Sequence, residues 1–345
     1  MKYIFLLLSL ILLMQFDAIS QSRNSFPQDS VTNNYGEMIT SIINDTYDSK
    51  YDNALKETDK LIIAFPNDPV GYLYKSGVYW KMFEEGCYES KDSAKLQIKT
   101  LIDRACEVSR QRLDADPDDI MTNFYCAGSL VYRAGFEAMD HDWIAVMSDG
   151  LKAKKLLEKT IELDPNFYDA YSGLGAFNYY ADRIPWFLKP IAFVLGVRGN
   201  EAGGIAQLKK AVQSGKYAKV EASVFLASVV YVNNGDYSNA AKLMNELHQQ
   251  FPDNLDFVKN LCHDYYEQQM YFDVVRLANS ALEMEDEKGP CHRNSLCLIR
   301  FYRGKSFEKL NEKNKAIADY EIVLEEDGDG YPGREAKAAL EKLVH

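Results

Sequence analysis

Small and apolar residues recur at helical spacing along most of the chain and are separated by short polar turns. Residues 221–254 show this pattern clearly: one stripe precedes a turn at 234–237, a second stripe follows it, and Pro252 ends the unit. The stripes consist of Val224, Ala227, Ser228 and Tyr231, and then of Ala240, Met244 and Leu247. Spacing of three and four residues is typical of amphipathic helices. The unit is therefore predicted to be a helix–turn–helix.

Proline residues divide the rest of the chain in the same way. Pro66, Pro117, Pro165 and Pro252 each follow an amphipathic run and stand beside Asp or Asn. Proline ends one helix, and the neighbouring Asp or Asn can cap the next. About seven such repeats are expected over residues 35–330, with a capping helix at 331–345. Strand patterns are nearly absent, so an all-α chain is predicted.

Repeats two to four are longer than the others. Pro66 and Pro117 are 51 residues apart, and Pro117 and Pro165 are 48 apart. In repeat four, Gly175 lies 29 residues before Gly204. We expect the additional residues to form insertions between the paired helices of these repeats.

The order of small, aromatic and terminal proline positions resembles the tetratricopeptide-repeat (TPR) pattern across residues 35–330. That resemblance implies a right-handed helical solenoid whose concave face, lined by the first helix of each repeat, binds a protein or peptide. It also implies which positions face the partner. These are Tyr125, Tyr132, Arg133, Tyr179, Tyr180, Phe225, Asn233, Lys259 and His263. An alternative for the tyrosines is packing between repeats, since the chain has 23 of them.

Repeat four carries an apolar insertion at 184–197 that includes Trp186, Phe187 and Phe193. We expect it to fold back as a short helix that buries Trp186 and Phe193, because such side chains usually lie in a core. The alternative is docking onto a lipid surface or a partner protein.

A narrower resemblance covers about 40 residues around this insertion. Residues 173–180, 184–188 and 203–208 are similar to the middle of a eukaryotic TPR family associated with the outer mitochondrial membrane and inclusion-body clearance. The chain departs from that family at 197–200, where it reads Val-Arg-Gly-Asn. Its N-terminus is expected to be an export signal, so a mitochondrial location is not carried over.

The N-terminal residues are expected to be a signal peptide rather than part of the fold. Lys2 precedes an apolar run at 3–16, and Ala18-Ile19-Ser20 resembles a cleavage site. Residues 1–20 would be removed and 21–34 would form a flexible leader. An uncleaved anchor is the alternative, although the apolar run is short for one. The protein is predicted to be exported, as a periplasmic or a secreted protein.

The chain is acidic, with a formal net charge of -12. That balance argues against nucleic acid as a partner, because phosphates require basic surfaces. It also argues against docking on anionic membranes by charge alone. A basic or neutral partner remains open.

Six cysteines allow disulfides in an exported protein. Proximity in the sequence favours pairing Cys106 with Cys126, and Cys262 with Cys291 or Cys297. A buried free thiol is the alternative for Cys262. The two Cys-His dipeptides at 262 and 291 lack the spacing of zinc ligands, so neither a metal nor a cofactor is expected.

No combination of residues indicates catalysis. The leading hypothesis is therefore an exported, non-catalytic TPR scaffold that binds a protein or peptide. The alternative is a lipid or small-molecule carrier in which residues 184–197 cover an apolar cavity, with peripheral membrane or lipid contact. The oligomeric state is left open.

Overall fold

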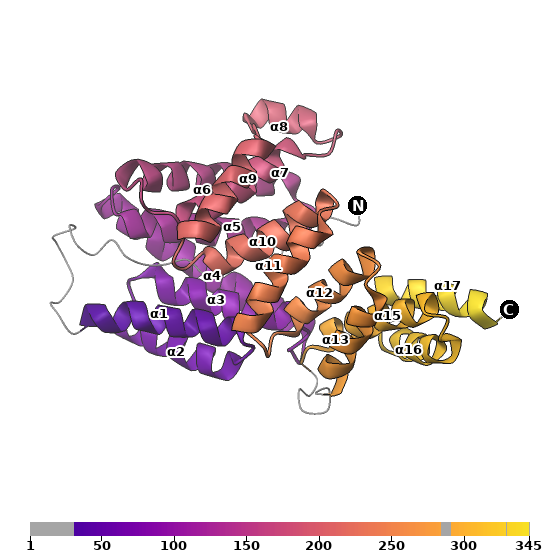
Figure 1. Ribbon diagram of the computed structural model, residues 1–345. Coiled ribbons are helices and arrows are strands. Elements are labelled where there is room, and N and C mark those ends of the chain that lie inside the picture. Colours follow the sequence, from indigo (N-terminus) through magenta and orange to yellow (C-terminus); the bar gives the residue numbers. More distant parts are fainter. Residues whose placement is uncertain (1–30, 284–290, 329, 345) are drawn as a thin grey trace. The chain divides into compact units, whose positions relative to one another are not determined.

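The chain is helical throughout the part that its computed structural model describes, residues 31–283, 291–328 and 330–344. Helices follow one another with short connections, and these residues contain no strand (Figure 1). The prediction of an all-α fold is confirmed. The expected signal peptide at 1–20 lies outside the described residues. Among those described, no helix is both long and apolar enough to span a membrane.

Within the described residues, the helices follow one another in chain order as seven helix–turn–helix units and a closing helix. The first four pairs are α1 (Val31–Tyr47) with α2 (Tyr51–Ala64), α3 (Pro69–Glu84) with α4 (Lys91–Ala115), α5 (Ile120–Met139) with α6 (Trp143–Leu163), and α7 (Ala170–Asp182) with α9 (Glu201–Ser214). The next three are α10 (Lys219–Phe225) with α11 (Tyr237–Gln250), α12 (Leu255–Glu267) with α13 (Tyr271–Glu283), and α15 (Arg293–Lys309) with α16 (Lys313–Glu326). A π-helical turn, Leu226–Tyr231, extends α10, and α17 (Tyr331–Val344) follows the last pair. Helix α1 begins at Val31, inside the stretch expected to be a flexible leader.

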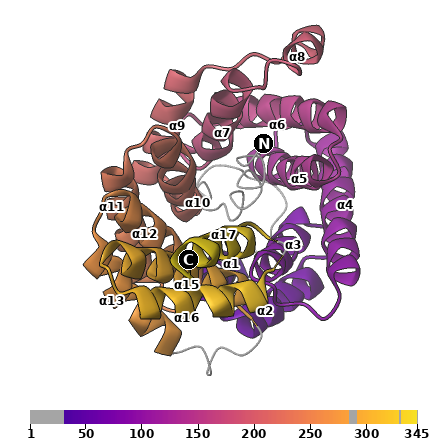
Figure 2. The ribbon, with the colours of Figure 1, turned by 90° about the vertical axis from the view of Figure 1, so that its right-hand side faces the viewer.

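The chain divides into two compact bodies. The first body comprises Met1–Lys81 and Ser90–Val229, and the second comprises Met82–Glu89 and Val230–His345. Helices α3 to α9 of the first body follow one another in chain order in Figure 2.

After Pro117 and Pro252, an Asp or Asn side chain caps the following helix, as predicted, whereas the Asp169 side chain before α7, after Pro165, forms no cap hydrogen bond. The Asp119 carboxylate accepts a hydrogen bond from the Thr122 amide at 3.1 Å, and the Asn254 side chain accepts one from the Phe257 amide at 3.3 Å. Each bond satisfies an amide that has no partner within its own helix.

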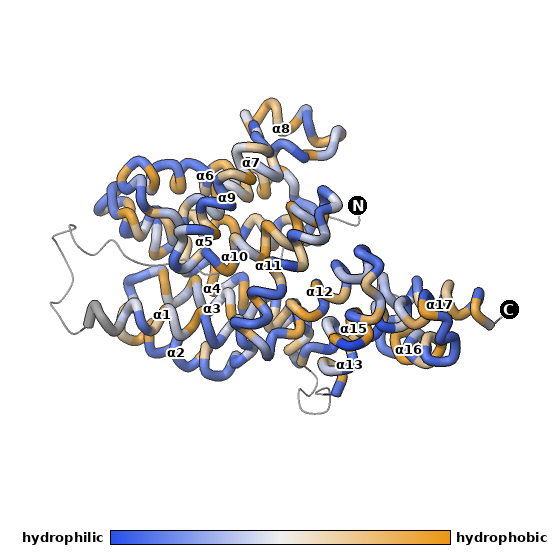
Figure 3. The backbone as a smooth tube through the Cα atoms, viewed as in Figure 1, coloured by the Kyte–Doolittle hydropathy of each residue, from blue (hydrophilic) through white to orange (hydrophobic). Residues whose placement is uncertain are grey.

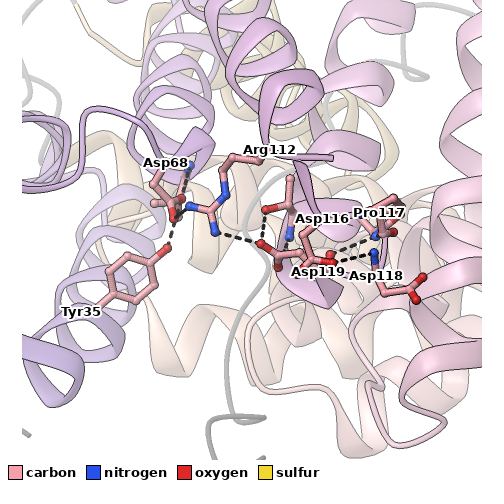
Figure 4. A network of polar contacts seen from close by, with 10 residues as sticks. Tyr35, Asp68, Arg112, Asp116, Pro117, Asp118 and Asp119 are labelled. Carbon is pink, nitrogen blue, oxygen red and sulfur yellow. Dashed lines mark hydrogen bonds and ion pairs between the residues drawn. The ribbon is translucent and has the colours of Figure 1, made fainter. Parts of the chain in front are cut away.

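Arg112, near the end of α4, joins two of these turns (Figure 4). Its guanidinium donates to Asp68 and to Asp119, both at 2.8 Å, and the Tyr35 hydroxyl donates to Asp68 at 3.3 Å. Burial raises the pKa of Asp119, but bonds from Arg112 and Thr122 outweigh burial and lower it below its ordinary value. The network thus fixes the starts of successive repeats to one another.

The positions of the additional residues differ from the expectation in repeats two and three. There the paired helices themselves are long, with 25 residues in α4, 20 in α5 and 21 in α6. Proline spacing gives the length of a repeat but does not show whether helical periodicity continues through it. Only repeat four carries a long segment between its paired helices, and that segment contains α8 (Lys189–Leu195).

Two glycines allow α7 and α9 to approach closely beside that segment. A Cβ atom on Gly175 would lie 2.7 Å from the Gly204 carbonyl oxygen, and one on Gly204 would lie 2.6 Å from the Gly175 oxygen. Side chains at either position would push the helices apart. These glycines belong to the stretch that resembles the narrower TPR family, and their role here is helix packing.

The first and last parts of the first body are in direct contact. The Tyr47 hydroxyl at the end of α1 donates to the Glu221 carboxylate of α10 at 2.6 Å, and both residues are buried. Burial raises the pKa of Glu221 well above its ordinary value, although the Tyr47 bond lowers it and Lys81 opposes the rise. The first body therefore closes on itself through a buried polar contact.

The cysteine pairing differs from the prediction. Cys87 forms a disulfide with Cys291, with 4.5 Å between their Cα atoms. Cys106, Cys126, Cys262 and Cys297 are free, and Cys262 is buried, which was the alternative considered for it. Proximity along the sequence was a poor guide because the segment 82–89 packs against the start of α15. Beside the disulfide, His292 contacts the buried Glu85 carboxylate, and the Asn294 side chain donates to the Glu84 carbonyl oxygen at 2.9 Å.

Candidate functional site

Four of the nine residues expected to face a partner are buried in the first body. Tyr125, Tyr132, Tyr179 and Phe225 are each at most 4% exposed. Tyr132 packs against Trp80 at 5.7 Å between ring centroids, and Tyr179 packs against Phe225 at 5.8 Å. These side chains join neighbouring helices, as in the alternative considered for the tyrosines. Their burial removes them from the surface available to a partner.

Two further predicted residues in the first body are half-buried. Arg133 forms an ion pair with the buried Asp149, which also accepts from Lys152 at 2.9 Å. The Tyr180 ring lies 5.1 Å from that of Phe225, and burial raises the pKa of Tyr180 above its ordinary value. The Arg133 and Tyr180 side chains thus contact mainly other residues of the first body, which leaves little of their surface for a partner.

The remaining predicted residues lie in the second body. Asn233 is exposed and lies just before the turn that precedes α11. Lys259 donates to Asp256 at 2.6 Å, and the same Asp256 oxygen accepts from Ser295 of α15 at 2.7 Å. His263 contacts the buried Asp264 at 2.8 Å. Lys259 and His263 are half-buried on α12 and therefore retain accessible surface.

His263 belongs to a cluster of rings that successive helices contribute. Its imidazole lies 5.6 Å from the Tyr237 ring of α11 and 5.6 Å from the Tyr302 ring of α15. Tyr266 of α12 lies 6.0 Å from Tyr302, and the Lys305 ammonium lies 4.1 Å from the centre of the Tyr266 ring. We call Tyr237, His263, Tyr266, Tyr302 and Lys305 the aromatic face. All are half-buried except Tyr302, which is buried.

The charges around the aromatic face are mixed. Burial lowers the pKa of Lys305, and Glu267 and Glu335 partly oppose that shift. Burial also raises the pKa of Tyr266 to about 12, with Glu267 adding to it. The face combines tyrosine rings and hydroxyls with the Lys305 side chain, and the exposed Glu267 and Glu335 lie near Lys305. Such a surface suits a ligand that offers apolar and hydrogen-bonding groups.

Tyr266 and Lys305 were not among the predicted site residues. The register of repeat six selects Lys259 and His263, and its next inward positions are Glu267 and Gln268, one and two residues beyond Tyr266. No inward positions were assigned in repeat seven. Its small residue at the helix crossing is Gly304, where a Cβ atom would lie 3.1 Å from the Tyr320 ring. If Gly304 is aligned with the small residues at the helix crossings of the other repeats, Lys305 is the residue next to this crossing. That alignment could have identified Lys305 as a candidate from the sequence.

The apolar insertion of repeat four has a different arrangement from the one expected. It does form a short helix, α8, but Trp186 and Phe193 are each 82% exposed, and Phe187 is also exposed. The prediction that Trp186 and Phe193 are buried is wrong. Leu188 and Ala192 are the residues that pack inward, against Met147 of α6. Large apolar residues occur on all sides of this short segment, and only the side with Leu188 and Ala192 packs against α6. The large residues on the other side are therefore exposed to solvent.

The described residues contain no group of three or more His, Cys, Asp or Glu side chains placed to hold a metal ion. The Cys-His dipeptides have separate surroundings. Cys262 and Cys297 are buried in two different apolar clusters, and Cys291 is in the disulfide.

Comparison with known families finds a match to the tetratricopeptide repeat at residues 222–254. This is the helix–turn–helix unit that shows the apolar pattern most clearly, so residues 222–254 are similar to a tetratricopeptide repeat. A search of curated proteins finds no match.

Several solved structures are similar to the chain. A thermophilic TPR protein of Thermus thermophilus is 15% identical, with 67% of this chain and 99% of that chain covered and a TM-score of 0.41. A tetratricopeptide repeat protein of Parabacteroides merdae is 14% identical, with 91% and 100% covered and a TM-score of 0.36. Yeast Tom70 is 13% identical, with 90% and 80% covered and a TM-score of 0.32. Similarity at this level gives no information about a partner.

Proposed function

Because a segment similar to a tetratricopeptide repeat lies within a chain of successive helix pairs, we propose that this protein is a non-catalytic scaffold that binds a polypeptide through the aromatic face of its second body. Repeat solenoids present extended surfaces that bind other proteins. The observation that supports this location is the half-buried cluster of rings around Lys305, contributed by α11, α12 and α15.

The chemistry of the aromatic face fits a polypeptide. Tyrosine offers a large contact area and a hydroxyl at a low entropy cost, and aromatic residues are enriched among those that dominate binding energy. Lys259 adds an ammonium and His263 an imidazole on the same helix, α12. Exposed Glu267 and Glu335 near Lys305 favour a segment with apolar or basic side chains over an acidic one.

The carrier alternative receives no support from the insertion of repeat four. A lid over an apolar cavity would direct its large side chains inward, whereas Trp186 and Phe193 are exposed. We further propose that the protein is exported, on the basis of the Lys2 and 3–16 pattern and the cleavage site at 18–20. Detection of a mature N-terminus at Gln21 would test that part of the proposal.

The binding proposal is tested by purifying the protein from its native cells after mild crosslinking and quantifying associated proteins by mass spectrometry. The test variant is Tyr266→Ala combined with Lys305→Ala, which removes the ring and the ammonium above it. The matched control is Phe272→Ala on α13 of the same body, whose side chain is 75% exposed. We expect a specific protein to be lost at least about tenfold from the double variant and retained by the control, since each such contact contributes more than about 1 kcal/mol.

Equal recovery from all three proteins would contradict the assignment of the aromatic face. Circular dichroism and thermal melting of the double variant show whether it remains folded. If it does not, Tyr266→Phe with Lys305→Met keeps the packing volume and removes the hydroxyl and the charge, and the same comparison applies.

A further inference from the structure

Large apolar side chains are exposed together on the insertion of repeat four. Of the fourteen large apolar residues exposed in the described part of the chain, six lie within 186–195. They are Trp186, Phe187, Ile191, Phe193, Val194 and Leu195. The other eight are spread over the rest of the described chain. Contiguous apolar patches of this kind usually mark an interaction site.

The opposite side of the same segment is anchored. Leu188 and Ala192 are buried against Met147 of α6, with Trp143, Ile184 and Val197 packed around them. At its base, the Arg183 guanidinium pairs with Glu201 at 2.6 Å. The segment is therefore held in place by the first body rather than left as a loose loop.

Its position in the first body leaves the exposed side accessible. Helix α8 lies at the outer edge of that body in both Figure 1 and Figure 2, beyond α7 and α9. Figure 3 shows apolar positions on this outlying segment. No other described helix of the first body contacts α8 as extensively as α6 does.

The charges near the exposed apolar residues at 186–195 indicate which kind of surface they bind. The chain has 51 acidic residues and 39 basic ones, yet residues 183–200 contain Arg183, Lys189 and Arg198 and no Asp or Glu. Lys189, the first residue of α8, and Arg198, three residues beyond its last residue, are both exposed. Aromatic side chains flanked by Lys and Arg are typical of segments that lie in the membrane–water interface. The charged ends of Lys189 and Arg198 can contact anionic headgroups while the aliphatic parts of these side chains remain beside apolar surface.

We propose that residues 184–198 dock the protein on the surface of a lipid bilayer that contains anionic lipids. Trp186, Phe187, Phe193 and Val194 enter the boundary between headgroups and acyl chains. Lys189 and Arg198 lie at headgroup level. The mode is peripheral attachment, with the first body outside the bilayer, and it is separate from polypeptide binding by the second body.

The three tryptophans of the chain make the first test direct. Trp80 is buried and Trp143 is half-buried, whereas Trp186 is 82% exposed. Vesicles of phosphatidylcholine with a minority of phosphatidylglycerol should shift the emission of the protein to shorter wavelength. Brominated acyl chains should quench that emission, and Trp186→Phe should abolish both signals. Unchanged emission with every vesicle would overturn the proposal.

Vesicle flotation with matched variants supplies a second test that does not depend on fluorescence. Trp186→Ser with Phe193→Ser should lower the partition coefficient at least about tenfold, because each large side chain that leaves the lipid loses more than a tenfold factor. Ile63→Ser with Phe272→Ser removes two equally exposed apolar residues from other helices and should leave the coefficient unchanged.

Two other results would count against the proposal. Equal loss in both double variants would mean that general hydrophobicity rather than this segment drives flotation. Concentration-dependent dimerisation that is abolished by Trp186→Ser with Phe193→Ser, without flotation of the original protein, would identify a second copy of the chain as the occupant.

Discussion

The two bodies use the same kind of residue differently. In the first body, Tyr179 and Phe225 are buried between helices, and the Tyr47–Glu221 contact joins α1 to α10. In the second body, Tyr266 is half-buried, and its ring lies beneath the Lys305 ammonium. Aromatic rings of the first body thus supply packing between helices. In the second body, neighbouring helices leave the Tyr266 ring partly exposed, which is why we propose that it contributes to binding.

The largest expected effect separates the packing role from the binding role. Phe225→Ala should destabilise the first body by about 3–5 kcal/mol, because it removes a fully buried ring and leaves a cavity. Tyr266→Ala should cost the second body only about 1–2 kcal/mol, because less of its area is buried. Hydrogen exchange measured in increasing denaturant reports the amides of each body separately. Equal costs in the two bodies would contradict the contrast drawn between them.

The next effect concerns a covalent link that belongs to the second body alone. Cys87→Ser should lower the stability of that body by about 2–4 kcal/mol, since the disulfide with Cys291 restricts the unfolded chain. A reductant added to the original protein should have the same effect. Cys106→Ser is the control, because Cys106 is a free cysteine in the first body. A melting curve that reductant leaves unchanged would argue against the pairing.

A smaller effect tests the closure of the first body through its dependence on pH. Burial raises the pKa of Glu221 in the folded state, so the folded protein holds this proton at pH values where the unfolded chain has released it. The stabilisation is complete below the ordinary glutamate pKa of about 4.3 and is lost as pH rises through the folded pKa. The loss should be about 1.4 kcal/mol for each pH unit between the two values.

Glu221→Gln should remove that fall in stability while keeping an acceptor for Tyr47. Denaturation midpoints measured at a series of pH values give the comparison. Glu162→Gln is the matched control, because Glu162 is exposed on α6 of the same body. Identical pH profiles for the original protein and Glu221→Gln would show that Glu221 does not titrate differently on folding.

The sequence was sufficient for the helix pairs because their signals are local. Pro117 with Asp119, and Pro252 with Asn254, define where one helix ends and the next begins, and the caps form as expected. The stripe at 224–247 gives the period. Helix boundaries, caps and the repeat period can each be predicted from a few neighbouring residues.

The features that the sequence did not reveal depend on residues far apart in the chain. The Cys87–Cys291 disulfide spans a separation of 204 residues, and the contact between Tyr47 and Glu221 spans 174. Burial of Tyr125 and Tyr132 depends on which helices cover them. Exposure of Trp186 and Phe193 depends on which side of α8 fits against Met147. The register of a repeat shows which residues are expected to face inward, but it does not show how deeply each of them is buried.

Site-specific photo-crosslinking tests the central claim most directly. A photoreactive amino acid would replace Lys259 beside the aromatic face, or Lys242, which is exposed on α11. We expect that position 259 yields a discrete crosslinked polypeptide in native cells, that position 242 does not, and that Tyr266→Ala with Lys305→Ala abolishes the product. The same product from both positions, or one that persists in the double variant, would contradict it.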